Sequence, residues 1–183
     1  LVSNASGSSV QGGSTLTQQY VKNILVASAT DDSEAAAATA RTPARKLREM
    51  RYALAVERSM SKKEILAGYL NIAYFGAGAY GVEAASRRYF SKSANALTLP
   101  EASLLAGLVQ RPYAFDPMVH PDAAKNRRSQ VLSRMADLGY ITREKADEVA
   151  KQSVTELLNP TSNSNGCTTS FAPYFCDYAV HVV

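Results

Sequence analysis

Helix start signals recur along the chain and constrain its fold more than any other local pattern. Some are capping boxes, in which a hydroxyl and an acidic or amide side chain three residues later satisfy free backbone N–H groups. Others are threonine caps or prolines in a first helical turn. In chain order the signals are Thr15 with Gln18, Thr42 with Pro43, Ser61 with Glu64, Thr98 with Glu101, Pro121 and Thr142. No alternating strand pattern appears before the last dozen residues, so the sequence predicts a mainly α fold.

The composition is that of a globular domain with a tail. The chain has 183 residues, of which 46% are hydrophobic and 20% are charged, so it can bury a core and is not disordered throughout. The net charge of +4 favours anionic partners. Nucleic acid, anionic lipid and phosphorylated small molecules are all compatible with it. We expect a domain over residues 1–158 and a Pro-, Ser- and Asn-containing linker over residues 159–183. The chain starts at Leu1 without methionine and has no membrane-spanning run, so we expect it to be part of a longer protein.

The first candidate site is the stretch Gln11–Asn23, where two glycines precede a capped helix. Helical spacing predicts a buried face and an opposite polar face. The buried face would hold Leu16, Tyr20, Val21, Ile24 and Leu25, and the polar face Thr15, Gln18, Gln19 and Lys22. Such a row of donors near a helix N-terminus suits an anion, although most polar helix faces are only solvated.

The second candidate site lies on the helix expected over residues 44–59. Leu47, Met50 and Leu54 form an apolar stripe on this helix. Arg45 and Glu49 share another face one turn apart. Spacing alone favours a surface ion pair over a catalytic carboxylate held by a cation.

The helix expected over residues 62–71 should turn Ile65, Leu66, Tyr69 and Leu70 inward. The segment Gly76–Gly81 after it has the literal pattern G-x-G-x-x-G. A dinucleotide site would need that pattern between a strand and a helix, and the preceding apolar residues keep a helical period. We therefore interpret the segment as a glycine-rich connector between two helices.

The helix that starts at Pro121 should expose its basic residues and end at Gly139, a residue suited to the position after a helix. The basic residues are Lys125, Arg127, Arg128 and Arg134. In the tail, Cys167 and Cys176 allow three interpretations. The first is a disulfide, and the second is two unrelated thiols. The third is a zinc site completed by the two histidines, although the cysteines lack the paired C-x-x-C spacing that is usual for zinc.

Together these segments resemble the peptidoglycan glycosyltransferase domain, family 51, of the bifunctional class A penicillin-binding proteins. The resemblance runs from about Gln11 to Lys151. It rests on four ordered motifs, which are far more specific together than any one of them. They are Gly-Gly-Ser-Thr-Leu-Thr-Gln-Gln over residues 12–19, Arg-Lys-Leu-Arg-Glu over 45–49, Lys-Lys-Glu-Ile-Leu over 62–66 with Tyr-Leu-Asn over 69–71, and Pro112 through Phe-Asp-Pro at 115–117.

The resemblance implies a lysozyme-like helical fold with a membrane-dipping subdomain, and polymerisation of lipid II with release of undecaprenyl pyrophosphate. It assigns Glu49 a catalytic role near the departing phosphates, where it would hold a divalent cation, Mg²⁺ or Mn²⁺, or hydrogen-bond the donor. No organic cofactor is implied. The implied substrate-binding residues are Ser14, Thr15, Gln18, Gln19, Lys22, Arg41, Arg45 and Lys46. The Ala-rich segment before Arg41 is longer than the connection that the family resemblance implies.

The same resemblance implies partners and a location. The partners would be lipid II, the growing glycan strand, the membrane surface and proteins of cell-wall synthesis or division, with no nucleic acid. The parent protein would be anchored by an N-terminal helix at the extracytoplasmic face of the cell membrane and carry a penicillin-sensitive transpeptidase domain. The family's first motif, with the glutamate thought to be the general base, is missing upstream of Gln11. We therefore expect the 183-residue chain to be inactive by itself.

Three other functions stay open at this stage. A lysozyme-like enzyme would cleave glycan, which product analysis would reveal. A non-catalytic module would bind cell-wall or membrane anions without turnover. A nucleotide oxidoreductase is the weakest option, because it rests on the glycine pattern alone.

Overall fold

The computed structural model describes residues 14–161, and the chain divides into two compact units. In the described part, the first unit consists of residues 14–74 with Tyr80–Val82. The second consists of Phe75–Ala79 and residues 83–161. The described residues contain no strand beyond an isolated bridge between Tyr74 and Tyr80, which confirms the prediction of a mainly α fold. Most of the predicted linker, with Cys167 and Cys176, lies outside the described residues.

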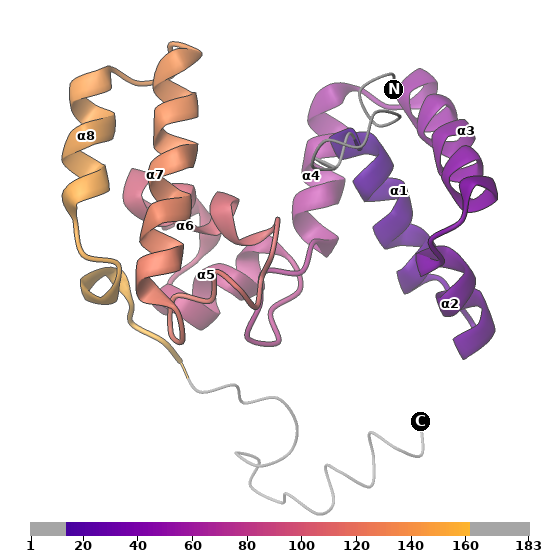
Figure 1. Cartoon of the computed structure of the whole chain (residues 1–183), viewed down its shortest axis with the longest axis horizontal. Helices are drawn as coiled ribbons and strands as arrows, with labels where there is room; N and C mark the ends of the chain where they lie inside the picture. Colours follow the sequence, from indigo (N-terminus) through magenta and orange to yellow (C-terminus); the bar gives the residue numbers. More distant parts are fainter. Residues whose placement is uncertain (1–13, 162–183) are drawn as a thin grey trace, which may run out of the picture. The chain divides into compact units, whose positions relative to one another are not determined.

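The first unit is built around its first helix. Its helices are α1 (Leu16–Ala27), α2 (Asp32–Thr39), α3 (Pro43–Ser59) and α4 (Lys62–Ile72). Helix α1 packs against each of the other three, as Figure 1 shows. In the range that the structure describes, no helix is long and apolar enough to cross a membrane.

The helix starts lie where the sequence predicts them. Thr15 with Gln18 and Ser61 with Glu64 form complete capping boxes, and the Thr42 hydroxyl accepts a hydrogen bond from the backbone of α3. These signals are local, because each cap is satisfied within its own first turn.

The buried faces of α1 and α4 agree with the prediction in part, since Val21 of α1 and Ile65 and Tyr69 of α4 are buried as expected. On α1, Thr17 and Val21 are buried, whereas Leu16 and Ile24 are exposed. On α3, Glu49 and Ala53 are buried. Two residues of the apolar stripe of α3, Leu47 and Leu54, are each 60% exposed. Leu66 of α4, which we expected to point inward, is 45% exposed.

The glycine-rich segment after α4 is a connector, as predicted. The backbone N–H of Phe75 donates to the carbonyl of Ala79 at 2.9 Å, and that of Ala79 donates to Gly76 at 2.8 Å. Gly76 has a φ of +93°, a conformation that glycine adopts without strain. The turn leads directly into α5 (Val82–Phe90), and no strand precedes it.

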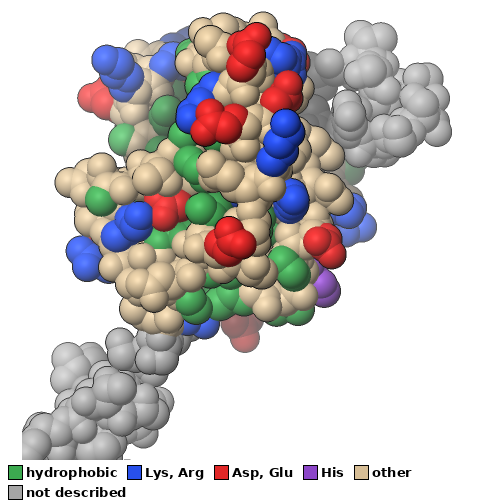
Figure 2. Space-filling model, turned by 90° about the vertical axis from the view of Figure 1, so that its left-hand side faces the viewer, with side chains coloured by type: hydrophobic (Ala, Val, Ile, Leu, Met, Phe, Trp, Pro, Cys, Tyr) green, Lys and Arg blue, Asp and Glu red, His purple; other side chains and the backbone are tan. Residues whose placement is uncertain are grey.

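The second unit packs α7 (Pro121–Asp137) against both α6 (Leu99–Leu108) and α8 (Arg143–Lys151). Two short 3₁₀ turns, η2 (Ala94–Ala96) and η3 (Thr155–Leu157), complete it. Leu132, Ala146 and Val149 form a buried cluster between α7 and α8. Figure 2 looks onto the side that carries these two helices, where positive and negative side chains are mixed and neither sign forms a separate patch.

Arg128 is the main correction in this unit. We expected it on the exposed polar side of α7, but it is fully buried. Its Nη2 donates to the carbonyl oxygens of Val149 at 3.1 Å and Gln152 at 2.5 Å, which satisfies the C-terminal end of α8. Burial lowers the pKa of the Arg128 guanidinium, because a charged group loses its hydration there. Gly139 follows α7 with a φ of +74°, as predicted.

Candidate functional site

Lys46 is the centre of a polar cluster between α1 and α3. Its ammonium nitrogen donates to Ser14 Oγ at 2.5 Å, to Gln18 Oε1 at 3.1 Å and to Glu49 Oε1 at 2.5 Å. One cation therefore joins residues that are up to 32 positions apart in the sequence. Four of the predicted site residues meet at this nitrogen.

Glu49 is the buried anion of the cluster and is only 3% exposed. Arg45 Nη1 donates to Glu49 Oε2, while Lys46 donates to the other oxygen. The Arg45 Nε also donates to the carbonyl oxygen of Ala40, which precedes α3. Each oxygen of the carboxylate thus accepts from a different cation. Two such charged hydrogen bonds can offset the cost of burying the carboxylate. The spacing of Arg45 and Glu49 suggested a surface pair, but the carboxylate is buried.

The two glutamines of α1 turn toward different neighbours. Gln18 closes the capping box with Thr15 and accepts from Lys46 of α3. Gln19 accepts from the Tyr69 hydroxyl of α4 at 3.4 Å. The polar face predicted from helical spacing is therefore present, and both helices that flank α1 contact it.

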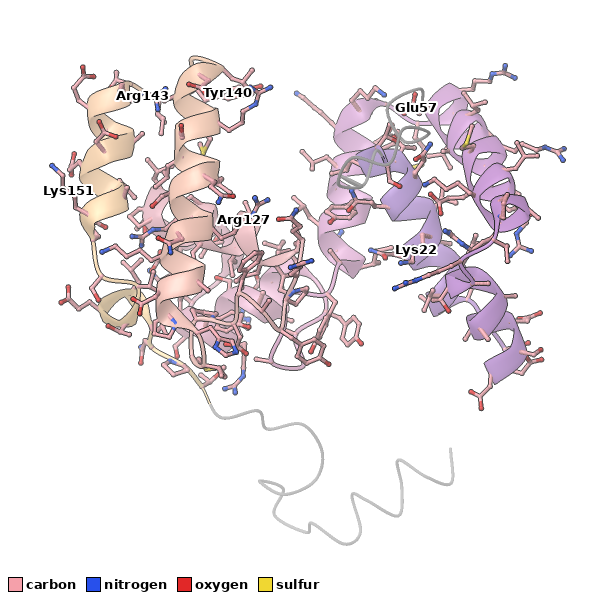
Figure 3. The ribbon with its side chains drawn as sticks, viewed as in Figure 1. Lys22, Glu57, Arg127, Tyr140, Arg143 and Lys151 are labelled. Atoms are coloured by element: carbon pink, nitrogen blue, oxygen red, sulfur yellow. The ribbon has the colours of Figure 1, made fainter. Side chains whose placement is uncertain are left out.

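Lys22 and Arg41 are predicted site residues that the structure does not join to this cluster. Both side chains are exposed, and neither forms a hydrogen bond or an ion pair with another residue of the range 14–161. Figure 3 labels Lys22 on α1 and Glu57 on α3, and the two side chains lie apart in that view. Both cations are thus unpaired within the described residues and available to an anionic ligand.

Thr17 and Glu57 form a link that the sequence did not reveal. The buried Thr17 hydroxyl donates to Glu57 Oε1 at 2.6 Å, and Lys62 forms an ion pair with the same oxygen at 3.1 Å. The hydrogen bond from Thr17 and the contacts of Lys62 hold the pKa of Glu57 below its usual value. No local signal predicts a contact across 40 residues. The link fastens the first turn of α1 to α3.

The described residues do not suit a divalent cation. Such ions need several oxygen ligands, and the positive charges of Arg45 and Lys46, which contact both Glu49 oxygens, would repel a second cation at this carboxylate. In the range 14–161, no group of three or more His, Cys, Asp or Glu side chains lies close enough to hold a metal. Instead, the cluster combines the positive charges of Lys46 and Arg45 with guanidinium, amide and hydroxyl donors, which suits an anion such as a phosphate.

A separate hollow of about 410 Å³ lies between α1, α2 and α3. Its lining includes Leu25, Ala38, Arg48 and Tyr52. None of the predicted site residues lines it, so the polar cluster is not part of this hollow.

Comparison with known proteins gives a consistent result. The family model described as Transglycosylase matches residues 1–136. Penicillin-binding protein 1A of Aquifex aeolicus is 43% identical over 155 residues, covering 85% of this chain and 20% of that protein. Penicillin-binding protein 1A of Streptococcus oralis is 36% identical over 177 residues, covering 97% of this chain and 26% of that protein. The chain thus spans about a fifth to a quarter of the length of these relatives.

A solved structure is also similar to part of the chain. Penicillin-binding protein 1A from Haemophilus influenzae aligns with a TM-score of 0.48 and 27% sequence identity, covering 79% of this chain and 17% of that structure.

Proposed function

Because the chain belongs to the transglycosylase family, we propose that it polymerises lipid II into peptidoglycan as part of a class A penicillin-binding protein. The observation that carries this proposal is the hydrogen-bonded cluster of Lys46 with Ser14, Gln18 and Glu49. It joins two of the motifs on which the resemblance rests. Its donors suit the pyrophosphate of a lipid-linked sugar, which has only acceptor oxygens.

In the proposed reaction, a sugar hydroxyl attacks the anomeric carbon while the bond from that carbon to the pyrophosphate oxygen breaks. The negative charge that develops on the leaving group needs fixed cationic donors. We assign this role to Arg45, which keeps guanidinium N–H groups that its hydrogen-bond partners do not use, and to the positive charge of Lys46, whose three N–H groups already bind Ser14, Gln18 and Glu49. Lys22 and Arg41 would be further cations that bind the substrate.

Glu49 would hold the two cations in place and would not take the proton. Each of its oxygens accepts a hydrogen bond from one of the two cations, so we assign it the role of positioning them. The proton would pass to another base, as the resemblance implies.

The exposed side of α3 has residues that suit contact with a membrane surface. Leu47 and Leu54 are exposed and, by helical spacing, share a side with the exposed residues Arg51 and Arg58. A face that mixes apolar and basic side chains suits the boundary of an anionic lipid layer. This supports our proposal that the parent protein works at the extracytoplasmic face of the cell membrane, beside its lipid-linked substrate.

Turnover of lipid II by the full-length protein tests the proposal. We expect glycan strands and released undecaprenyl pyrophosphate, and a loss of at least 100-fold in kcat for Glu49→Gln, because the two cations lose their shared anion. Glu148→Gln on the exposed side of α8 is the matched control and should retain wild-type turnover. Near-normal turnover by Glu49→Gln would disprove the role of Glu49.

Product size separates polymerisation from the other functions. Shorter glycan fragments in place of longer strands would indicate a glycan-cleaving enzyme, and binding without turnover a non-catalytic module. The inactivity of the 183-residue chain by itself stays a prediction, which polymer formed by that chain would contradict.

A further inference from the structure

The carboxamide oxygens of Gln18 and Gln19 are both occupied by donors from neighbouring groups. Gln18 Oε1 accepts from Lys46 Nζ at 3.1 Å and from the backbone N–H of Thr15 at 3.3 Å. Gln19 Oε1 accepts from the Tyr69 hydroxyl at 3.4 Å. Within the range 14–161, neither carboxamide nitrogen donates a hydrogen bond to another residue. The adjacent amides therefore both have unused N–H donors.

The orientation of an amide decides whether it attracts or repels an anion. One end of a carboxamide has two N–H donors and the other has an acceptor oxygen. A pyrophosphate accepts hydrogen bonds and donates none, so it binds the nitrogen end and is repelled by the oxygen. The ammonium of Lys46 has no acceptor, and this fixes the oxygen of Gln18 toward α3.

We infer that Tyr69 is a positioning residue that orients Gln19, so that the adjacent Gln18 and Gln19 both present N–H donors to the phosphates of the substrate. This inference rests on the proposed function and assigns Tyr69 a role beyond packing. Tyr69 is 5% exposed, and its ring is enclosed within the first unit while its hydroxyl reaches α1. Burial raises the pKa of this hydroxyl, so it keeps the proton that it donates.

The close packing of α1 and α4 lets Tyr69 reach Gln19. Gly68 precedes Tyr69, and a Cβ at Gly68 would lie 2.4 Å from the Tyr20 hydroxyl oxygen. The helices therefore approach each other at a position that has no side chain. Because Gln19 is exposed, its N–H donors are accessible to a ligand.

A double-mutant cycle in the full-length protein tests this inference through lipid II turnover. Tyr69→Phe keeps the ring and removes the hydroxyl, and we expect it to raise KM about five-fold, the usual scale for one hydrogen bond. If Tyr69 acts through Gln19, the same change should have no effect in a Gln19→Ala background. Tyr140→Phe, at an exposed position of the second unit, is the control and should leave KM unchanged.

The outcomes of this cycle are distinct. An equal rise in KM in both backgrounds would show that Tyr69 acts through packing, which overturns the inference and leaves the proposed function standing. A wild-type protein without lipid II turnover would overturn the proposed function and the inference together.

Gln19→Glu is a second test that does not need a Tyr69 variant to fold. The carboxylate has nearly the shape of the amide but replaces its N–H donors with acceptors. We expect KM to rise at least ten-fold, more than for Gln19→Ala, because an anion would now face the phosphates. A wild-type KM for Gln19→Glu would overturn the inference.

Discussion

The ammonium nitrogen of Lys46 lies 2.5 Å from Glu49 Oε1, within one turn of the same helix. This nitrogen also contacts Ser14 and Gln18 at the start of α1. The cation therefore has two tasks, to balance a buried carboxylate and to hold α3 against the first turn of α1. Its replacement should affect both turnover and stability.

Lys46→Met keeps most of the side-chain volume but removes the charge and all three hydrogen bonds. We expect kcat for lipid II to fall 100-fold or more, because in the proposed reaction the departing phosphates lose a fixed positive charge. The free energy of unfolding should fall by about 1–3 kcal/mol, because Glu49 loses one of its two partners. Turnover assays and urea unfolding measure the two effects. Lys63→Met, an exposed lysine of α4, should change neither, and wild-type turnover in Lys46→Met would contradict the assignment.

Arg128→Met should destabilise the second unit without a direct effect on the polar cluster. The change leaves the carbonyl oxygens of Val149 and Gln152 without their shared donor. We expect the free energy of unfolding to fall by about 1–3 kcal/mol. Arg134→Met, an exposed arginine of the same helix, should lie within about 0.5 kcal/mol of wild type. Equal effects of the two changes in chemical denaturation would contradict the capping role of Arg128.

Glu101 should make the stability of the fold depend on pH. Burial would raise the pKa of Glu101, but hydrogen bonds from Lys92 and Thr98 outweigh burial and hold this pKa below its usual value. A lowered carboxyl pKa stabilises the fold above the unfolded-state pKa of about 4.3, and that contribution disappears as the pH falls through the folded-state pKa.

Unfolding of wild type and Glu101→Gln by urea between pH 3 and pH 7 tests this dependence. The variant should be less stable than wild type near pH 7, and the difference should shrink below about pH 4.3. Glu148→Gln, whose carboxylate is exposed, should show little such convergence. A difference between wild type and Glu101→Gln that stays constant over this range would contradict the assignment.

Gly81 and Gly139 offer a matched comparison, because both have a positive φ, +86° and +74°. A Cβ at Gly81 would lie 2.6 Å from the carbonyl oxygen of Asn71, whereas a Cβ at Gly139 would have no atom within 4 Å. Gly139→Ala should therefore cost only the backbone strain, about 1 kcal/mol, and Gly81→Ala clearly more. Thermal unfolding of both variants measures the difference. Equal costs would show that the backbone at Gly81 yields without penalty.

The helix starts were predictable from the sequence, whereas the buried faces were predictable only in part. A cap such as Thr15 with Gln18 is satisfied within four residues, so its signal is local. A face becomes buried only where another helix covers it, and helical spacing does not identify that helix. This is why Leu47 and Leu54 are exposed while Thr17 and Glu49 are buried. Arg128 was misassigned for the same reason, because its partners are backbone carbonyls more than 20 positions away.

The candidate site was predictable in part. Spacing placed Arg45 beside Glu49, and the family resemblance brought α1 and α3 together as parts of one site. Neither indicated that Lys46 joins Ser14 to Glu49, because that contact depends on the packing angle of two helices. The roles of Thr17 and Tyr69 also depend on this packing.

Helix α2 buries a single side chain, Ala38, and begins with its own cap at Asp31. A helix that has its own N-cap and buries one side chain contributes little to the core. We therefore expect a change in its length to lower the free energy of unfolding only slightly. The connection between the two motifs is therefore a place where we expect the gene to gain or lose codons while the protein keeps its fold. It is equally a place where an epitope or a fluorescent label can be inserted to follow the protein in living cells.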